Sequence, residues 1–358
     1  MNTGMGIGTD MGTGMSEGEG VGMGMGTGTA PPTTPPGGGP AAAARPGGRG
    51  RRERHRPRGW LVAVAALLCA APLALSSHLP NAVGNLGSLC QTVLPWSGLG
   101  ILLLLCCAAI RRSVLAATAV LVPALVWSAL FGPALIDKRS GGGDFTVVSH
   151  NVNEENPDPG RTARALAASG ADVLAVEELA SRAQETFRHA LAATHPYSQI
   201  REGVGLWSRY PLEDVEPVEI MPWTRALRAT VRTPKGPVAL YAVHLASVRV
   251  YPTTGFATAS RNEAAARLAE ALRAERLTRI VVLGDFNGSV DDSALHALTG
   301  PLRSAQREAG DGFGFTWPAS FPLVRIDQIL VSGLTPRAAW TLPATGSDHL
   351  PVAASLRL

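Results

Sequence analysis

Three long apolar stretches in the first half of the chain constrain its fold more than any other feature. They cover residues 60–79, 89–110 and 113–136, and none contains Asp, Glu, Lys or Arg. Each is close to the roughly 20 residues that a helix needs to cross a bilayer. Buried core helices are the alternative, but three uncharged stretches in succession favour membrane spans. We therefore predict three transmembrane helices within residues 59–137.

Charge is distributed unevenly around these stretches. Before Gly141 lie 11 of the 32 Lys and Arg residues but only 5 of the 28 Asp and Glu residues. Seven Arg precede the first stretch, and Arg111 and Arg112 separate the second from the third. The positive-inside rule places the tail and this loop in the cytoplasm, in preference to a nucleic-acid-binding use of the basic run. Three crossings then predict a multi-pass plasma-membrane protein with an extracytoplasmic C-terminal domain.

Composition divides the chain into four parts. Residues 1–58 are rich in Gly, Pro and Arg and predict a disordered cytoplasmic tail, because they hold too little apolar surface to fold. Residues 59–137 hold the spans, and residues 138–144 read as a Gly-rich linker. Residues 145–358 form one domain-sized unit. None of the four cysteines follows Gly141, which excludes a disulfide and a Cys-based zinc site from that unit.

The C-terminal unit alternates short apolar strands with helices. Asp158 before Pro159 predicts a helix start, because an Asp side chain caps free backbone N–H groups and Pro suits the first helical position. Helices are also expected over about 181–193 and 258–276. Strands are expected over 145–152, 172–179, 238–245, 280–283, 326–331 and 352–356. This pattern predicts an α/β fold for residues 145–358.

Polar residues follow or interrupt these strands. Sites in α/β folds form where such strand ends and their loops converge. The candidates are Asn151, Glu177, Glu178, His244, Asp285, Asn287, Asp327, Asp348 and His349. Each alone is a weak signal, since a Gly-Asp turn is usually only a turn and a lone His is usually a satisfied core residue.

Asp327 is harder to dismiss, because it lies inside an apolar strand. An unpaired buried carboxylate is costly, so Asp327 needs a partner. His349 is our candidate, since a carboxylate fixes the tautomer of a histidine and raises its basicity. Glu178 and Asp348 offer the hard oxygen ligands that Mg²⁺ prefers, with Mn²⁺ as the alternative ion.

Together these groups suit hydrolysis of a phosphate ester. A metal ion neutralises phosphate oxygens, and His349, oriented by Asp327, transfers a proton. His244 and Asn287 would donate hydrogen bonds to the phosphoryl oxygens, and Asp285 would orient the attacking water.

With these residues in place, the chain resembles the endonuclease/exonuclease/phosphatase superfamily. Seven stretches match in the family's order: SHNVN (149–153), DVLAVEEL (172–179), GLWSRYPL (205–212), YAVHLAS (241–247), VVLGDFN (281–287), RIDQILVS (325–332) and GSDHLPV (346–352). The resemblance implies a four-layer αββα sandwich of two packed sheets flanked by helices.

The resemblance also implies roles for individual residues. It places Asn151 and Glu178 at the metal site, with Asp348 nearby. It implies that His244 and Asn287 contact the scissile phosphate and that Asp327 and His349 are hydrogen-bonded. Whether Asp285 or His349 is the base stays open.

Two positions depart from the family pattern. Glu177 stands where Gln is common, and we expect its extra negative charge to alter metal binding. His150 replaces a more usual aromatic or polar residue. Neither change removes a catalytic group.

Three spans followed by this domain are also similar to actinobacterial membrane proteins of the vancomycin/teicoplanin-resistance VanJ type. That resemblance rests on architecture. It implies a hydrolase at the cell envelope acting on a lipid-linked phosphate, such as a polyprenyl pyrophosphate carrier, or on a phospholipid.

The substrate classes rank as lipid-linked phosphate, then nucleic acid, then soluble phosphate esters. The part after Gly141 carries 21 basic and 23 acidic residues, a net charge of −2, whereas nucleases depend on Lys and Arg. The spacing of three arginines predicts that they lie on the exposed face of a strand: Arg225, Arg228 and Arg232. Large apolar residues of the loops are expected mostly in the core, and any that are exposed would suit a lipid: Met221, Trp223, Tyr251, Phe256, Phe313, Phe315, Trp317 and Phe321. A non-catalytic envelope-binding protein is the remaining alternative, but no catalytic group is missing.

Overall fold

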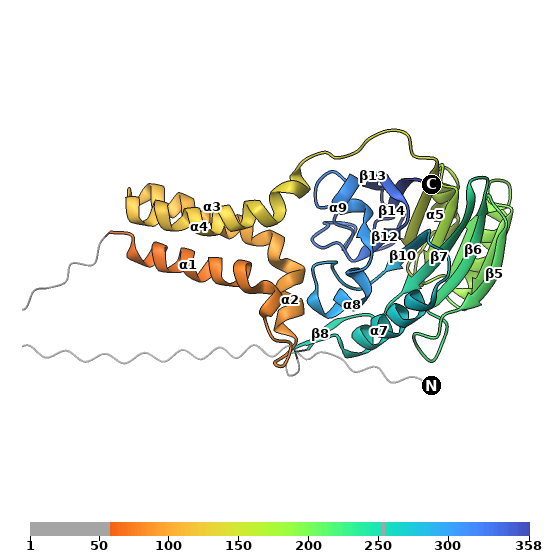
Figure 1. The fold of residues 1–358 in the computed structure, drawn as a ribbon, viewed down its shortest axis with the longest axis horizontal. Helices are drawn as coiled ribbons and strands as arrows, with labels where there is room; N and C mark the ends of the chain where they lie inside the picture. The colour runs from red at the N-terminus through yellow and green to blue at the C-terminus, as the bar shows by residue number, and fades with distance from the viewer. Residues whose placement is uncertain (1–57, 252–254) are drawn as a thin grey trace, which may run out of the picture. The chain divides into compact units, whose positions relative to one another are not determined.

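The computed structural model describes residues 58–251 and 255–358, in which apolar helices precede an α/β domain (Figure 1). The predicted disordered tail, residues 1–58, lies outside the described residues except for Arg58.

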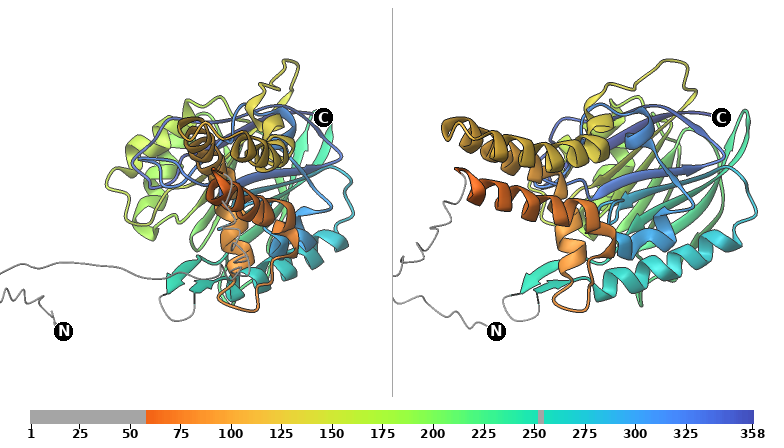
Figure 2. Two further views of the ribbon diagram at one scale, coloured as in Figure 1. Left: turned by 90° about the vertical axis from the view of Figure 1, so that its left-hand side faces the viewer. Right: turned by 60° about the vertical axis from the view of Figure 1, so that its left-hand side comes forward.

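The apolar stretches form helices, as predicted. The main helices are α1 (Trp60–Leu75), α2 (Leu86–Val93), α3 (Ser97–Ile110) and α4 (Val114–Phe131), and α1, α3 and α4 pack alongside one another (Figure 2). A 3₁₀ turn, Leu94–Trp96, separates α2 from α3 at Pro95, which has no N–H to continue an α-helix. Three helical segments are long and apolar enough to cross a membrane: Trp60–His78, Leu86–Ile110 and Val114–Leu135.

Arg58, Arg111 and Arg112 lie at one end of the group of apolar helices. Ser113 Oγ donates a hydrogen bond to the carbonyl of Arg58 at 2.6 Å. This contact places the start of α1 beside the loop that carries Arg111 and Arg112. At the other end, Gln91 Nε2 of α2 donates to the carbonyl of Ser76 at 2.6 Å.

The domain contains two six-stranded mixed sheets. The first has the spatial order β13 (Thr335–Thr341), β14 (Val352–Arg357), β1 (Phe145–Asn151), β2 (Val173–Glu177), β4 (Val204–Ser208) and β3 (Tyr197–Arg201). The second has the order β11 (Arg303–Ser304), β12 (Asp327–Ser332), β10 (Ile280–Asp285), β7 (Gly236–His244), β6 (Ala226–Thr233) and β5 (Leu212–Pro217). β8 (Arg249–Tyr251) and β9 (Gly255–Ala257) form a separate pair.

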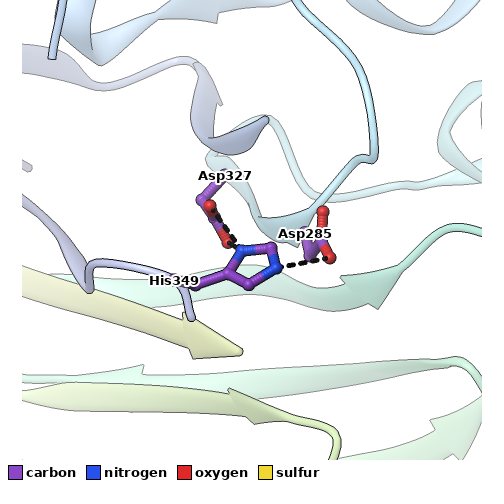
Figure 3. A group of neighbouring side chains, drawn as sticks. All are labelled: Asp285, Asp327 and His349. Carbon is purple, nitrogen blue, oxygen red and sulfur yellow. Dashed lines mark hydrogen bonds and ion pairs between the residues drawn. The ribbon is translucent and has the colours of Figure 1, made fainter. Parts of the chain in front are cut away.

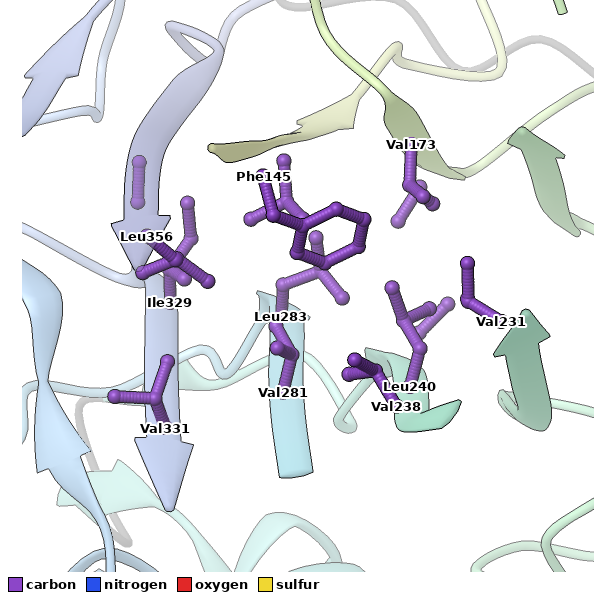
Figure 4. Close-up of a cluster of buried hydrophobic side chains, with 14 of the residues drawn as sticks. Phe145, Val173, Val231, Val238, Leu240, Val281, Leu283, Ile329, Val331 and Leu356 are labelled. Atoms are coloured by element: carbon purple, nitrogen blue, oxygen red, sulfur yellow. The ribbon is translucent and has the colours of Figure 1, made fainter. Parts of the chain in front are cut away.

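The two sheets pack face to face around the main hydrophobic core. Phe145 and Val173 of the first sheet are buried with Leu283 and Ile329 of the second (Figure 4). The outer face of the first sheet packs on α5 (Pro159–Ala167) and α6 (Gln184–Leu191), and that of the second on α7 (Ala259–Ala274) and α8 (His296–Thr299). The short α9 (Ala305–Ala309) contacts β13. These four layers confirm the predicted αββα sandwich after three apolar segments.

Local sequence signals set several element ends. Asp158 caps α5, since its Oδ1 accepts a hydrogen bond from the N–H of Arg161 at 2.8 Å, and Pro159 occupies the first helical position. In β10, Gly284 has φ 149°, and a Cβ there would lie 1.8 Å from the carbonyl oxygen of Val243. Only glycine therefore lets β10 pass this close to β7 just before Asp285.

A nearly buried ion pair joins β6 to the end of α7 and supports a stability prediction. Arg228 Nε lies 3.1 Å from Glu275 Oε2, which also accepts a hydrogen bond from Tyr241 Oη at 2.8 Å. Burial raises the pKa of Glu275, but its hydrogen bonds, with Arg228 first, outweigh burial and lower the pKa to about 2. Ionised Glu275 therefore contributes its full stabilisation at pH values above 4.5, the ordinary pKa of a Glu carboxyl. This contribution is lost as the pH falls through about 2.

We expect Glu275→Ala to lower the free energy of unfolding at neutral pH by about 3–5 kcal/mol, because it removes one partner of this pair. Denaturant unfolding of the full chain in detergent measures the change. Glu263→Ala, which removes an exposed pair with Arg267, is the control and should change stability by less than about 1 kcal/mol. Equal effects of the two variants would refute the prediction.

Candidate active site

The predicted residues converge because the ends of paired strands meet at one edge of the sandwich. Asn151 and Glu177 are partners at the ends of parallel β1 and β2. His244 and Asp285 are partners at the ends of parallel β7 and β10, and Asp327 lies opposite Asp285 on antiparallel β12. Asn151 Nδ2 donates to Asp285 Oδ2 at 3.0 Å, which joins the two sheets at this edge.

His349 and Asp327 form the hydrogen-bonded pair that the sequence predicts (Figure 3). His349 Nδ1 lies 2.9 and 3.1 Å from the two carboxylate oxygens of Asp327. Burial disfavours the protonated ring, but the charge and hydrogen bond of Asp327, with smaller contributions from Asp285 and Asp348, raise the pKa of His349 to about 10. His349 is therefore held as an imidazolium, with Nε2 3.9 Å from Asp285 Oδ2.

Asp285 lies at the centre of the group and is almost completely buried. Burial, followed by the charge of Asp327, raises its pKa to about 7. Its Oδ1 accepts a hydrogen bond from the N–H of Asn287 at 2.8 Å. A carboxylate with a pKa near neutrality exists in both protonation states at physiological pH, as an acid–base group requires.

Asn287 is held tightly beside Asp285. Its Nδ2 donates to Asp285 Oδ2 and to the carbonyl of Leu245, both at 3.1 Å, so both amide hydrogens are engaged within the protein. Its φ of 46° is a left-handed conformation that costs energy outside glycine and is common at functional sites. The predicted contact of Asn287 with a phosphate thus requires one of these hydrogen bonds to be exchanged.

His244 is buried and neutral, which suits a hydrogen-bond donor. Burial, followed by the charges of Arg225 and His349, lowers the pKa of His244 well below its usual value. Arg225 Nη1 contacts both ring nitrogens of His244, Nδ1 and Nε2, the latter at 3.2 Å. His244 Nε2 also lies 3.4 Å from Glu178 Oε1 and 3.8 Å from Asp285 Oδ2.

The sequence predicts Asn151, Glu178 and Asp348 as the metal ligands. Glu178 and Asp348 line one cavity, and Asn151 lies beside them through its bond to Asp285. Asp348 is fixed by Asn153 Nδ2 at 2.9 Å and by Trp317 Nε1 at 3.2 Å. Glu178 has φ 54°. Two carboxylates and an amide oxygen form a hard donor set, which fits a divalent cation such as Mg²⁺.

A second grouping also brings potential ligands together. Asp285, Asp327 and His349 place one ligand atom each within 4.8 Å of one another. His349 Nδ1 is already bound to Asp327, and both groups are buried. We therefore interpret these three residues as the acid–base group, adjacent to the metal ligands.

Glu177, the position where the family commonly has Gln, lies inside the domain. Its side chain is fully buried, and Ser149 Oγ donates to it at 3.0 and 3.2 Å. Burial, and then the charge of Asp327, raises the pKa of Glu177 well above its usual value. This shift opposes the extra negative charge that the sequence predicts at this position.

The candidate catalytic groups line a cavity of about 650 Å³ together with apolar side chains, and we call these two sets of lining residues its polar wall and its apolar wall. The polar wall contains Glu178, Asp285, Asn287, Asp348 and His349. The apolar wall contains Leu89, Val93 and Trp96 from the second apolar segment, together with Phe256, Trp317 and Leu323. Trp96 Nε1 donates to the carbonyl of Leu323 at 2.7 Å, which fixes the two parts of this wall to each other.

The expected burial of the loop aromatics is wrong. None of the eight large apolar residues singled out in the sequence belongs to the buried core, and Trp223, Trp317 and Phe321 are exposed. Phe313 and Phe315 pack instead against Trp127 and Trp96 of the apolar segments. An additional apolar surface, and not the sheet core, accepts these side chains.

The arginine cluster also differs from the prediction. Only Arg232 has the expected exposed position, paired with Glu213 at 2.6 Å. Arg228 is half-buried against Glu275, and Arg225 precedes β6 and contacts His244. Sequence reasoning thus missed Arg225 as a site residue, because its spacing resembles that of an ordinary exposed strand.

Solved structures with the same fold include enzymes and a protein of unknown function. The Bacteroides thetaiotaomicron VPI-5482 mannosyl-6-phosphatase Bt3783 is 18% identical over 60% of this chain and 100% of its own, with a TM-score of 0.50. Humanized D. rerio TDP2 is 16% identical over 60% and 99%, with a TM-score of 0.50. A conserved Enterococcus faecalis V583 protein is 15% identical over 59% and 99%, with a TM-score of 0.51. At these identities the likeness shows the fold alone.

No curated protein matches this chain. The sequence profile of one family matches residues 148–349, more than half of the chain, and that range includes every candidate site residue. Members of this family hydrolyse phosphate esters. The chain belongs to the Endonuclease/Exonuclease/phosphatase family.

Proposed function

We propose that this protein is a membrane-anchored, metal-dependent phosphoesterase that hydrolyses a lipid-linked phosphate at the outer face of the plasma membrane. One observation carries the proposal. The cavity that holds the catalytic groups is also lined by apolar side chains, including Leu89, Val93 and Trp96 of a candidate membrane span. A substrate with a phosphate next to a hydrocarbon chain matches both walls.

The polar wall supplies the groups that phosphoester hydrolysis needs. A divalent cation, Mg²⁺ or alternatively Mn²⁺, would be held by Glu178, Asp348 and Asn151 and would supply positive charge beside the phosphate oxygens. His244 would present a ring N–H to the same place and so stabilise developing negative charge. Arg225, whose guanidinium contacts the ring, would hold His244 in place.

Proton transfer would use the paired acid and base. Asp285, with its pKa near 7, can orient and deprotonate an attacking water, and Asn287 and Asn151 hold its carboxylate in place. His349, kept protonated by Asp327, can give a proton to the leaving oxygen. The opposite assignment, with His349 as base, would require His349 to release its proton first.

The expected topology follows from charge and length. Arg58, Arg111 and Arg112 lie at one end of the apolar helices, and Gln91 joins the opposite end to Ser293 of the domain. The positive-inside rule assigns the arginine end to the cytoplasm. The domain would then face the cell envelope, in agreement with the VanJ-type resemblance, and a polyprenyl pyrophosphate carrier is our first candidate substrate.

A direct comparison of substrates tests this function. The full chain in detergent micelles with Mg²⁺ is offered a polyprenyl pyrophosphate, a phospholipid, plasmid DNA and a water-soluble phosphodiester. We expect kcat/KM to be highest for a lipid substrate, and we expect His349→Ala to abolish all activities alike. Rapid nicking of plasmid DNA without lipid hydrolysis would replace the proposal with a nuclease. If the wild-type protein is no more active than His349→Ala on any of these substrates, the result would favour a non-catalytic envelope-binding protein.

A further inference from the structure

A second buried ion pair lies beside the active site and takes no part in the chemistry described above. Arg261 of α7 and Asp292 are joined by Nη2 and Oδ2 at 2.6 Å, and neither side chain is exposed. Burial lowers the pKa of Arg261, and the charge of Asp292 opposes this shift. Burying two charges is costly, and such pairs are best explained when they fix a specific arrangement.

Asp292 connects this pair to the apolar segment. Its second oxygen, Oδ1, accepts a hydrogen bond from Ser88 Oγ of α2 at 2.8 Å, and Ser88 is fully buried. One turn further along α2, Gln91 Oε1 accepts a hydrogen bond from the N–H of Ser293 at 2.8 Å. Two polar residues of an otherwise apolar helix are therefore bonded to the domain.

Arg261 connects the same pair to the catalytic loop. Its Nη1 donates to the carbonyl of Asn287 at 3.1 Å. Asn287 holds Asp285 and has a left-handed backbone that needs support from its surroundings. The chain Ser88–Asp292–Arg261–Asn287 thus runs from the apolar helix to the residue beside Asp285.

An adjoining face of α2 lines the candidate substrate cavity. Leu89 and Val93, four residues apart on one helical face, line the cavity together with Thr92. Ser88 and Gln91 lie on the face bonded to the domain. Any shift of α2 would therefore move the apolar wall relative to the catalytic loop.

We propose that Asp292 and Arg261 are positioning residues that fix the apolar wall of α2 and the Asn287 loop to each other, and that this coupling selects substrates carrying a hydrocarbon chain. The inference rests on the proposed phosphoesterase function and adds a specificity device to it. A soluble phosphodiester contacts only the polar wall, so its hydrolysis does not need the apolar wall to be fixed relative to the Asn287 loop. A lipid phosphate must contact both walls at once, so loosening α2 raises its KM.

The test uses substitutions in α2, outside the catalytic and metal-binding groups. In the full chain, Ser88→Ala removes the hydroxyl group that donates a hydrogen bond to Asp292. Ser88→Thr keeps a hydroxyl group at this position. Thr118→Ala, whose hydroxyl bonds only within α4, is the matched control. We expect Ser88→Ala to raise KM for the lipid substrate about tenfold, as for loss of a hydrogen bond to a charged group, with a much smaller change in soluble phosphodiester hydrolysis. Ser88→Thr should largely restore KM.

A second measurement does not depend on any substrate. Hydrogen exchange of the full chain should show faster exchange at residues 285–292 in Ser88→Ala than in wild type or Thr118→Ala. Unchanged exchange and unchanged KM would overturn the coupling, and so would an equal loss of activity on lipid and soluble substrates. If wild type hydrolyses neither substrate, the proposed function fails, and the exchange experiment still decides whether α2 and the catalytic loop are coupled.

Discussion

Replacing His349 with alanine is expected to lower kcat by about 10²–10⁴-fold on every substrate that the enzyme hydrolyses, because it removes the protonated group beside the leaving oxygen. The proposed role of His349 rests on its bond to Asp327 at 2.9 Å and on a pKa raised to about 10. Steady-state kinetics of the purified full chain at neutral pH measure the effect. KM should change little, since the loss concerns the transition state.

Asp327→Asn is the companion variant for this prediction. It keeps the shape of the side chain but removes the charge that holds the proton on His349. If the two residues act as a unit, the double variant Asp327→Asn/His349→Ala should be no slower than His349→Ala alone, because effects within such a unit are not additive. Full additivity, or retention of wild-type kcat by His349→Ala, would contradict the pair mechanism.

Removing the metal is expected to abolish activity, and Glu178→Ala should raise the Mg²⁺ concentration for half-maximal activity by about 100-fold or more. Glu178 offers a partly exposed carboxylate at the cavity, beside Asp348 and 3.4 Å from His244 Nε2. Its loss leaves one carboxylate for the cation. Activity is measured after treatment with a chelator and then during titration with Mg²⁺ or Mn²⁺.

Glu185→Ala is the matched control for the metal titration. Glu185 lies on α6 with its side chain 85% exposed. The substitution Glu185→Ala therefore removes one negative charge, as Glu178→Ala does, but leaves the cavity unchanged. Its titration curve should overlie that of wild type. Full activity after chelation, or identical metal requirements for Glu178→Ala and Glu185→Ala, would exclude the proposed metal ligands.

The pattern of short strands and helices predicts an α/β unit, and the family resemblance adds the four-layer sandwich. Strand register explains why several candidate site residues lie together. Asp285 and His244 end adjacent parallel strands, and Asp327 begins the strand opposite, so the apolar runs before and after them already place these side chains at one edge. The pairing of Asp327 with His349 follows from the energetic cost of a lone buried carboxylate. These features depend on local pattern and simple electrostatics.

Other features depend on contacts that local pattern does not specify. The spacing of Arg225 resembles that of an exposed strand residue, and only the packed structure shows its contact with His244. The charge state of Glu177 depends on complete burial next to Asp327. Ser88 and Gln91 are two polar residues in an apolar stretch, and only their bonds to Asp292 and Ser293 show that α2 docks on the domain. In each case a distant partner determines the role.

The central claim is that the cavity between the catalytic groups and the apolar wall hydrolyses a phosphate attached to a hydrocarbon chain. The most direct measurement is product release from a polyprenyl pyrophosphate or a phospholipid by the full chain with Mg²⁺, set beside a water-soluble phosphodiester and the His349→Ala variant. We predict metal-dependent hydrolysis of a lipid substrate with the larger kcat/KM, and none by the variant. Equal hydrolysis of lipid and soluble substrates, or no hydrolysis of either lipid, would contradict the account.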